Sequence, residues 1–444
     1  MNRFYCPMLN PLYEGVNLDN LCVGTYLVAA EKNENPVIKA ASIGVEQTTG
    51  SWVDVPCETD EMRAKYAAKI LGVYEVPDYE LQTPMNHEIT DGELRYYIMR
   101  IAYPTDNIDD NIPLLLATVT GNITAMPYLR LLDIDFGKNF IKRFKGPKFG
   151  IEGIRKILGV KERPLLNNMI KPCTGYTPDV GAKLFYEAAV GGVDIIKDDE
   201  LIGGDRSFNK LTDRVKANME AAIKADEIKK EKTMYTVNIT DEIYRLKDNA
   251  LCAIEAGVNG IMLNVFATGF SALRDLAEDP SITVPILAHW CYGGAQSVSP
   301  LQGVSSIALN KLIRLCGADT VLIVPPYGKF DSTFLKYMRN ITTCTSKFAH
   351  LKPMLPFIGG GVIAGLVPTI MDDAGNDVLL GVGAGIHAHP MGAKAGAVAF
   401  RKAIDATMNN TSLREAAKSS EELKLALEKW GVYGEEDLKK NYAI

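Results

Sequence analysis

Beyond residue 160, short apolar runs alternate with longer stretches in which apolar residues recur at helical spacing. Each run has the length of a buried strand, and the stretch after it can form a helix that returns the chain to the same edge of a parallel sheet. Eight such units over roughly 270 residues match a closed (β/α)8 TIM barrel in number and length. An open doubly wound sheet is the alternative. The runs are 165–170, 193–196, 234–239, 260–266, 284–288, 320–324, 354–358 and 378–382.

Similar turns lead into three of these runs, at 191–194, 256–259 and 316–319, each with glycine in its second position. Glycine commonly follows the last turn of a helix because it adopts left-handed backbone angles without strain. The turns therefore mark helix ends and support the alternation of helices and strands.

Before the barrel pattern, strand-like and helix-like stretches are mixed. Residues 21–30 and 94–103 have the pattern of strands. Thr59 can cap a helix that we expect to begin at Asp60 and to run through Leu71.

This mixture predicts two domains. We expect an N-terminal α+β domain of the ferredoxin-like kind over residues 1–138, and the barrel domain over 139–444. The barrel domain ends in a helical tail from about residue 411, where Ser419 and Glu422 have the spacing of a capping box.

Length and composition narrow the class of protein. A chain of 444 residues suits two domains, and 47% apolar with 23% charged residues is typical of a globular protein. The net charge of −6 argues against nucleic acid as a partner, and no apolar run approaches the roughly 18 residues of a membrane span. The start of the chain lacks the apolar core of a signal peptide, and the eight cysteines form no Cys-x-x-Cys pair. We therefore expect a cytoplasmic protein with reduced thiols.

Ionisable side chains follow the second apolar run, where Lys197, Asp198, Asp199 and Glu200 are consecutive. The carboxyl ends of barrel strands build the active site. Side chains alternate along a strand, so Lys197 and Asp199 share a face, and adjacent carboxylates are oxygen ligands suited to Mg²⁺. We predict a magnesium site at Asp199 and Glu200. Lys197 would join it either as an ammonium group in an ion pair or, after reaction with CO2, as a carbamate ligand.

Glycine-rich segments follow the last two runs. Barrels often bind phosphate beside strands seven and eight through backbone N–H groups, which glycine allows to approach closely. The predicted phosphate-binding residues are Gly359, Gly360, Gly361, Gly383, Ala384 and Gly385.

Single ionisable residues close two further runs, Lys171 the first and His289 the fifth. A packed structural histidine would explain His289 as well as a site role would, and an ion pair with a carboxylate would explain Lys171. We take both as candidates because of their places at strand ends. His387 and His389 have no further ligand nearby in the sequence, and we expect them to support the site.

These residues resemble the RuBisCO superfamily, and the resemblance covers most of the chain. The segment 192–200 is similar to the RuBisCO segment with the carbamylated lysine and both magnesium carboxylates. The segment 170–172 resembles the one with the lysine that serves as enolising base, and Lys329 falls where the lysine of the mobile loop six falls. Segments 46–52 and 121–122 resemble parts of the N-terminal domain that reach into a neighbouring subunit's barrel.

Several functional assignments follow from the resemblance alone. It implies Mg²⁺ as cofactor, with CO2 bound as a carbamate of Lys197, and Lys171 as the base. It also implies a homodimer, or a multiple of dimers, in which Glu46 and Asn122 act in shared sites.

Four positions depart from the carboxylase pattern. Cys173 stands in place of a lysine, Trp290 of an arginine and Gly359 of a serine, and the histidine of strand six is replaced near Leu322. Each replacement removes a group that handles the substrate in the carboxylases. We therefore expect no carboxylation of ribulose bisphosphate.

Other segments look closer to the RuBisCO-like enolase of methionine salvage, which acts on 2,3-diketo-5-methylthiopentyl 1-phosphate. The proposed base of that enolase is a lysine at the position of Asn122, and an asparagine cannot accept a proton at neutral pH. Lys171 is then the candidate that remains. The similar segments are 146–151, 264–267, 276–280 and 387–390.

The resemblance implies a Mg²⁺-dependent isomerase or lyase that removes a proton beside a carbonyl of a phosphorylated keto sugar derivative. Methionine-salvage enolisation is the preferred reaction. Lys171 would take the proton, with its pKa lowered by neighbouring positive charge, while His289, Lys329 and Asn122 contact the substrate. A decarboxylase or transcarboxylase of a phosphorylated 3-oxo sugar acid, and a non-catalytic structural or regulatory homologue, are the alternatives.

Overall fold

The computed structural model describes residues 16–50, 55–76, 94–330, 332–436 and 438. Ser51 and Trp52, at the end of one family-like segment, lie outside the described residues. The chain forms two compact units. The first comprises the described residues up to Phe144 together with Gly293–Leu312, and the second comprises the rest. A domain boundary between residues 138 and 139 stays a prediction.

Eight parallel strands of the second unit close into a barrel, in the order β11-β12-β13-β5-β6-β7-β8-β9. Every strand falls within or next to one of the apolar runs, so the predicted barrel is confirmed and the open sheet is wrong. The strands are β5 (Leu165–Met169), β6 (Ile195–Lys197), β7 (Met234–Asn238), β8 (Gly260–Asn264), β9 (Ile286–His289), β11 (Thr320–Ile323), β12 (Leu355–Gly359) and β13 (Leu379–Val382).

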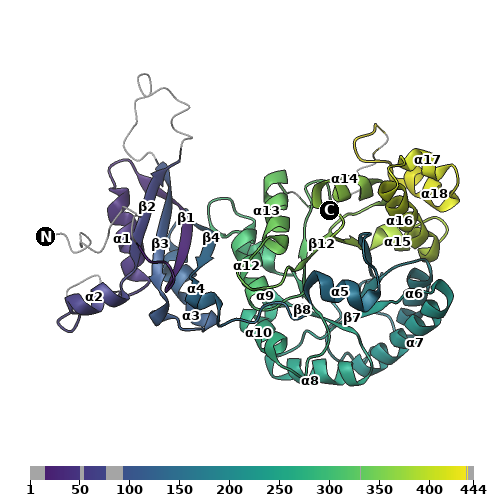
Figure 1. The fold of residues 1–444 in the computed structure, drawn as a ribbon, viewed down its shortest axis with the longest axis horizontal. Coiled ribbons are helices and arrows are strands. Elements are labelled where there is room, and N and C mark those ends of the chain that lie inside the picture. Colours follow the sequence, from purple (N-terminus) through teal and green to yellow (C-terminus); the bar gives the residue numbers. More distant parts are fainter. Residues whose placement is uncertain (1–15, 51–54, 77–93, 331, 437, 439–444) are drawn as a thin grey trace. The chain divides into compact units, whose positions relative to one another are not determined.

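Helices connect the strands and surround the barrel (Figure 1). Those of the second unit are α5 (Gly150–Leu158), α6 (Pro178–Val190), α7 (Leu211–Lys229), α8 (Ile243–Glu255), α9 (Val265–Thr268), α10 (Phe270–Glu278), α13 (Phe334–Thr345), α14 (Val367–Ala374), α15 (Ala384–His387), α16 (Ala393–Met408), α17 (Leu413–Ala417) and α18 (Glu421–Trp430). Helix α12 (Ser306–Leu315) begins in the first unit and ends in the second. The three glycines expected after helix ends, Gly192, Gly257 and Gly317, all have positive φ, at 106°, 101° and 101°.

The barrel interior changes character along its axis. Near the amino ends of the strands it is filled by buried apolar side chains, among them Leu165, Ile195 and Met234. At the following inward positions, two or four residues further on, the chain instead carries Lys197 and Asn238. Apolar side chains therefore fill one end of the barrel, and polar side chains lie at the other end.

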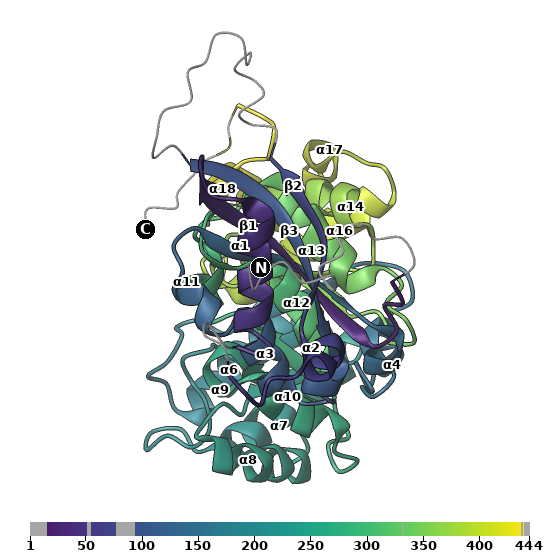
Figure 2. The same cartoon turned by 90° about the vertical axis from the view of Figure 1, so that its left-hand side faces the viewer.

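The first unit is an α+β domain, as predicted. Its five-stranded sheet has the order β10-β4-β1-β3-β2, in which β10 runs parallel to β4 and the other pairs are antiparallel. Helix α1 (Pro36–Glu46) packs on β2 and β3 (Figure 2). The other elements are β1 (Leu21–Glu31), α2 (Asp60–Tyr66), β2 (Lys69–Glu75), β3 (Leu94–Pro104), α3 (Ile112–Thr120), η3 (Asn122–Ala125), β4 (Leu129–Phe136), α4 (Lys138–Ile141), α11 (Gly293–Ser297) and β10 (Gly303–Val304).

Two local predictions were wrong. The helix capped by Thr59 ends at Tyr66 instead of Leu71, because the next residues form β2 and pair with β3. In the tail, the cap of α18 is Ser420 and not Ser419: the Ser420 hydroxyl oxygen accepts a hydrogen bond from the backbone N–H of Leu423 (3.3 Å).

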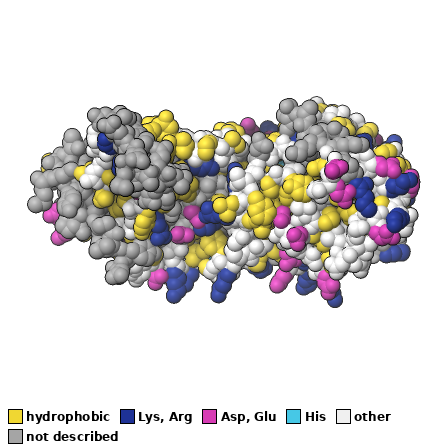
Figure 3. Space-filling model, turned by 90° about the horizontal axis from the view of Figure 1, so that it is seen from above, with side chains coloured by type: hydrophobic (Ala, Val, Ile, Leu, Met, Phe, Trp, Pro, Cys, Tyr) yellow, Lys and Arg dark blue, Asp and Glu magenta, His cyan; other side chains and the backbone are white. Residues whose placement is uncertain are grey.

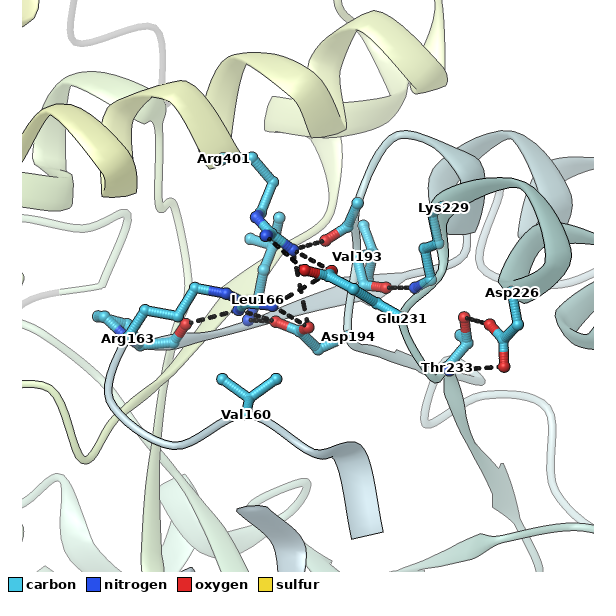
Figure 4. Close-up of polar contacts among 12 residues, drawn as sticks. Val160, Arg163, Leu166, Val193, Asp194, Asp226, Lys229, Glu231, Thr233 and Arg401 are labelled. Atoms are coloured by element: carbon cyan, nitrogen blue, oxygen red, sulfur yellow. Dashed lines mark hydrogen bonds and ion pairs between the residues drawn. The ribbon is translucent and has the colours of Figure 1, made fainter. Parts of the chain in front are cut away.

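A partly buried ion-pair network, centred on the buried carboxylate of Asp194, joins elements at the amino ends of the barrel strands (Figure 4). Both Asp194 carboxylate oxygens accept hydrogen bonds from the Arg163 guanidinium, each at 2.7 Å, and one also accepts from the backbone N–H of Leu166. Arg401, from α16, binds Glu231 at 2.8 and 3.1 Å. The network ties the outer helix α16 to the start of the strands.

We expect Asp194→Ala to destabilise the protein by about 3–5 kcal/mol, because it leaves the Arg163 guanidinium and the Leu166 N–H without their buried acceptor. Urea unfolding measures the change. Glu415→Ala is the control, since its side chain is 61% exposed and its pair with Lys418 is on the surface; a change within about 0.5 kcal/mol is expected there. Equal losses in the two variants would contradict a stabilising role of the network.

The described surface carries charges of both signs. On the face drawn in Figure 3, lysine and arginine side chains are interspersed with aspartate and glutamate over the barrel unit. Among the described residues, no helix has the length and apolar character to cross a membrane.

Candidate active site at the carboxyl ends of the barrel strands

The three consecutive acids after Lys197 have different surroundings. Asp198 is fully buried and turned away from the barrel axis, where it accepts hydrogen bonds from Arg214 Nε (3.0 Å), the Tyr235 hydroxyl (2.7 Å) and the backbone N–H of Asn238 (3.0 Å). These bonds occupy the Asp198 carboxylate. They also fix the end of β6, so that Lys197 and Asp199 share the inward face, as predicted from the alternation.

Side chains from three strand ends converge around these residues. Lys171 Nζ, after β5, donates to Asp199 Oδ2 at 2.6 Å. Lys197 Nζ lies 3.7 Å from Glu200 Oε2, and His289 Nε2, from β9, lies 3.4 Å from the same oxygen. The structure therefore brings together five of the side chains singled out in the sequence.

Two asparagines for which no role was predicted hold the loop after β6. Asn238 Nδ2 donates to the backbone oxygens of Asp199 and Glu200, each at 3.3 Å, and Asn264 Nδ2 donates to that of Glu200 at 3.0 Å. Their only signal in the sequence was a polar amide at the end of an apolar run. Both fix the backbone that carries the two carboxylates.

Burial and neighbouring charge set the protonation of the site. Burial lowers the pKa of Lys197 most, and the Lys171 charge lowers it further, against the opposing effect of Glu200 and Asp199. Burial, followed by the charge of Lys197, lowers the pKa of His289 well below its usual range, so its imidazole is neutral near pH 7. For Lys171, burial lowers the pKa, but the hydrogen bonds to Asp199 and Cys173 outweigh it and the net pKa is raised. This is the reverse of the direction expected from the sequence.

The donor set fits a magnesium ion if Lys197 supplies a carbamate. Among the described residues, no group of three His, Cys, Asp or Glu side chains is placed to hold a metal. Asp199 and Glu200 supply two carboxylates, and a carbamate on Lys197 would supply a third oxygen donor beside them. The Asn264 Oδ1 atom, whose amide nitrogen binds the Glu200 backbone, is buried without a described partner and leaves a further oxygen available.

The two glycine segments lie at the same end of the barrel. Gly360 and Gly361 have φ of 101° and 100°, and the Gly360 oxygen accepts the backbone N–H of Lys329 at 2.8 Å. A β-carbon on Gly383 would lie 3.1 Å from Lys171 Cε, so glycine lets this backbone pass close to the lysine. The side chain of Lys329 is exposed, with Nζ 4.7 Å from the ring centre of Phe330.

The residues that depart from the carboxylase pattern have the following neighbours in the structure. A β-carbon on Gly359 would approach Leu322 Cδ1 to 2.8 Å, so Leu322 occupies the room that a side chain at 359 needs. Trp290 packs against Phe266 with ring centres 4.7 Å apart. Cys173 Sγ lies 2.9 Å from Lys171 Nζ. The replacements give this site apolar walls and a thiol.

Glu46 and Asn122 lie in the first unit and contact each other. Asn122 Nδ2 donates to Glu46 Oε1 at 3.2 Å. The other carboxylate oxygen, Oε2, is buried and has no partner among the described residues.

Comparisons with known proteins agree with this architecture. Residues 9–140 match the family model of the ribulose bisphosphate carboxylase large chain, N-terminal domain, and residues 150–430 match that of its catalytic domain. A ribulose bisphosphate carboxylase-like protein of Archaeoglobus fulgidus is 48% identical over 94% of this chain and 95% of its own. A 2,3-diketo-5-methylthiopentyl-1-phosphate enolase of Geobacillus thermodenitrificans is 37% identical over 92% of this chain and 98% of its own.

Solved structures give the same result. A rubisco-like protein from Alicyclobacillus acidocaldarius superposes with a TM-score of 0.85 at 34% identity, covering 93% of this chain and 100% of its own. A dimeric archaeal Rubisco from Hyperthermus butylicus superposes with a TM-score of 0.82 at 28% identity, covering 93% and 96%.

Proposed function

The chain belongs to the ribulose bisphosphate carboxylase large-chain family, and from that membership we propose that it is a Mg²⁺-dependent enolase. It would remove a proton beside a carbonyl of a phosphorylated keto compound, with 2,3-diketo-5-methylthiopentyl 1-phosphate as the first substrate to test. The named activity of the relative from Geobacillus thermodenitrificans supports this choice. The seven described cysteines are all free, in keeping with a cytoplasmic location.

One observation carries the proposal. Lys171, Lys197, Asp199, Glu200 and His289 meet at the carboxyl ends of the barrel strands, with two lysines, two carboxylates and a neutral histidine in one cluster. That composition suits proton removal at a carbon whose neighbouring oxygen needs charge stabilisation.

Each residue has a distinct part in this proposal. Bound Mg²⁺ would polarise the substrate carbonyl. Lys171 would accept the proton once it has separated from Asp199. His289 Nδ1 accepts the backbone N–H of Cys291 at 3.1 Å, so the neutral imidazole would donate a hydrogen bond from Nε2 to a substrate oxygen. The backbone N–H groups beside Gly360, Gly361 and Gly383 would hold the phosphate.

Proton exchange in heavy water tests the function directly. Parent protein with Mg²⁺ and CO2 should incorporate deuterium into 2,3-diketo-5-methylthiopentyl 1-phosphate, and a panel of other phosphorylated keto compounds sets its preference. Release of CO2 from a phosphorylated 3-oxo acid would favour a decarboxylase instead. No exchange with any compound, together with no Mg²⁺ binding, would favour a non-catalytic protein.

Ribulose bisphosphate should not be carboxylated. Cys173, Trp290 and Gly359 lack the charged and hydroxyl groups expected at the carboxylase positions, and Leu322 Cδ1 would have to move to admit a side chain at 359. We expect no labelled CO2 in phosphoglycerate with pure protein. Incorporation above a control without enzyme would contradict this.

We also propose a dimer with sites shared between subunits, to which Glu46 and Asn122 of one chain and the barrel of the other contribute. Mixing inactive Asn122→Ala chains with inactive Lys197→Ala chains should restore up to about a quarter of the parent activity, since random pairing gives half hybrids with one intact site each. Exchange in heavy water measures the recovery. Absence of recovery in dimers shown to be mixed would count against shared sites.

A further inference from the structure

We infer that Gln302 is a positioning residue for Asn122, although the two lie far apart in the sequence and Gln302 falls between barrel strands β9 and β11. The inference rests on the proposed role of Asn122 in catalysis. A residue that comes between two barrel strands in the sequence would thus help to place a side chain of the N-terminal part of the chain.

Gln302 binds the backbone of the turn that carries Asn122. Its Nε2 donates to the backbone oxygens of Thr124 (2.8 Å) and Met126 (3.0 Å), and its Oε1 accepts the backbone N–H of Tyr128 (3.1 Å). These three bonds use both ends of the amide and span the chain from η3 to the start of β4. Tyr128 itself has a φ of 56°, a left-handed conformation that is uncommon for a side chain of this size.

A second glutamine holds the other side of the same turn. Gln47 Nε2 donates to the backbone oxygens of Ala117 and Thr118, each at 2.8 Å, and Gln47 Oε1 accepts the N–H of Ile123 at 3.4 Å. The backbone on both sides of Asn122 is therefore held by a glutamine side chain, Gln47 before it and Gln302 after it. We call each of these sets of hydrogen bonds a clamp. Gln47 directly follows Glu46, which accepts the hydrogen bond of Asn122, so Gln47 is close to this site in the sequence. Gln302 reaches the turn from a distant part of the chain.

The backbone of Gln302 is itself fixed. The next residues form β10, which adds to the edge of the sheet beside Arg130 and Leu131 of β4. Arg130, a buried side chain, donates to the backbone oxygens of Gln302 (3.2 Å) and Ser297 (2.9 Å). The segment from Gly293 to Val304 is thus held within the first unit, and its glutamine can hold the turn in one place.

Two substitutions of Gln302 separate the effect of its donor group from that of its acceptor group on the turn. Gln302→Met has a similar length and removes all three hydrogen bonds. Gln302→Glu keeps the acceptor for Tyr128 but places a carboxylate against two carbonyl oxygens. Gln296→Met and Gln296→Glu are matched controls, because Gln296 lies in the same segment and the hydrogen bonds to the turn come from Gln302.

The first measurement needs no substrate. Backbone amide hydrogen exchange should become faster over residues 122–128 in Gln302→Met, most of all at Tyr128, whose N–H loses its acceptor. The Gln296 variants should match the parent. Unchanged exchange over this turn in a folded Gln302→Met protein would overturn the clamp, whatever the protein's activity.

The second measurement is catalytic and uses the parent and variant dimers in heavy water. Misplacement of a substrate-contacting group by about 1 Å can cost on the order of 10²-fold in rate, so we expect the Gln302 variants to lose up to that factor in kcat with little change in Mg²⁺ binding. Asn122→Ala is inactive beside the parent, but its residual exchange rate can be followed at high protein concentration. Adding Gln302→Met should not lower that residual rate further, because both changes remove the same contact. Additive losses would mean that Gln302 acts elsewhere.

Mixed dimers give a third, independent result. Gln302→Met chains should recover activity when mixed with Lys197→Ala chains and should not recover it with Asn122→Ala chains. The opposite pattern would place the effect of Gln302 in its own barrel. The Asn122→Ala and Lys197→Ala mixture is the control: if it fails to recover, the shared site is wrong, and the inference is decided by amide exchange and by the double variant.

Discussion

We expect Lys197→Ala to eliminate all Mg²⁺-dependent proton exchange while the protein remains folded. Lys197 is 1% exposed, and its Nζ lies 3.7 Å from Glu200 and hydrogen-bonds to the Asp198 backbone oxygen at 2.7 Å. Burial lowers its pKa, which favours the neutral amine that can attack CO2. The product is a carbamate with two oxygen donors, and its proton is released to solvent. Without it, only Asp199 and Glu200 remain as oxygen ligands from this cluster.

Carbamylation can be measured apart from activity. Parent protein incubated with carbon-13-labelled CO2 and Mg²⁺ should give a carbamate signal by nuclear magnetic resonance, and Lys197→Ala should give none. Lys183→Ala, at an exposed lysine of α6, is the control and should keep both the signal and the activity. Full activity of the parent in CO2-free buffer would show that the carbamate is not required.

Replacement of Lys171 should produce the second large effect. Loss of a general base lowers the rate by about 10²–10⁴-fold, so Lys171→Met should nearly stop exchange of the substrate α-hydrogen with solvent. The side chain closes β5 and is one-third exposed at the barrel mouth, where a substrate can reach it. Lys183→Met is the control for the loss of a lysine.

Magnesium binding should be kept or become tighter in Lys171→Met. The ammonium of Lys171 forms an ion pair with Asp199 at 2.6 Å, and this pair competes with any cation for the carboxylate. The same pair raises the pKa of Lys171, so the lysine must leave Asp199 before it can act as a base. Exchange at the parent rate in Lys171→Met would exclude this lysine and make the Lys197 carbamate the leading candidate.

The sequence by itself determined the barrel and the position of its chemistry. Eight apolar runs of strand length, separated by helical stretches, allow few arrangements other than a closed parallel barrel. The place of Lys171, Lys197 and His289 directly after apolar runs put them at one end of that barrel. Alternation along β6 also predicted that Lys197 and Asp199 face the same way.

Tertiary structure decided the features that depend on partners distant in the sequence. Residues 69–71 were expected to continue a helix, yet they begin β2 because pairing with β3 outweighs local preference. The raised pKa of Lys171 could not be foreseen, since it depends on the 2.6 Å approach of a carboxylate 28 residues away.

The placement of Gln302 beside the turn of Asn122 has the same origin. Its three hydrogen bonds join residues more than 170 positions apart, and an amide at position 302 has no local pattern that points to them. Periodicity records which face of an element is buried, because that depends on near neighbours along the chain. Which side chains from distant parts of the chain contact each other depends on the path of the whole chain in space. Only the folded structure shows these contacts.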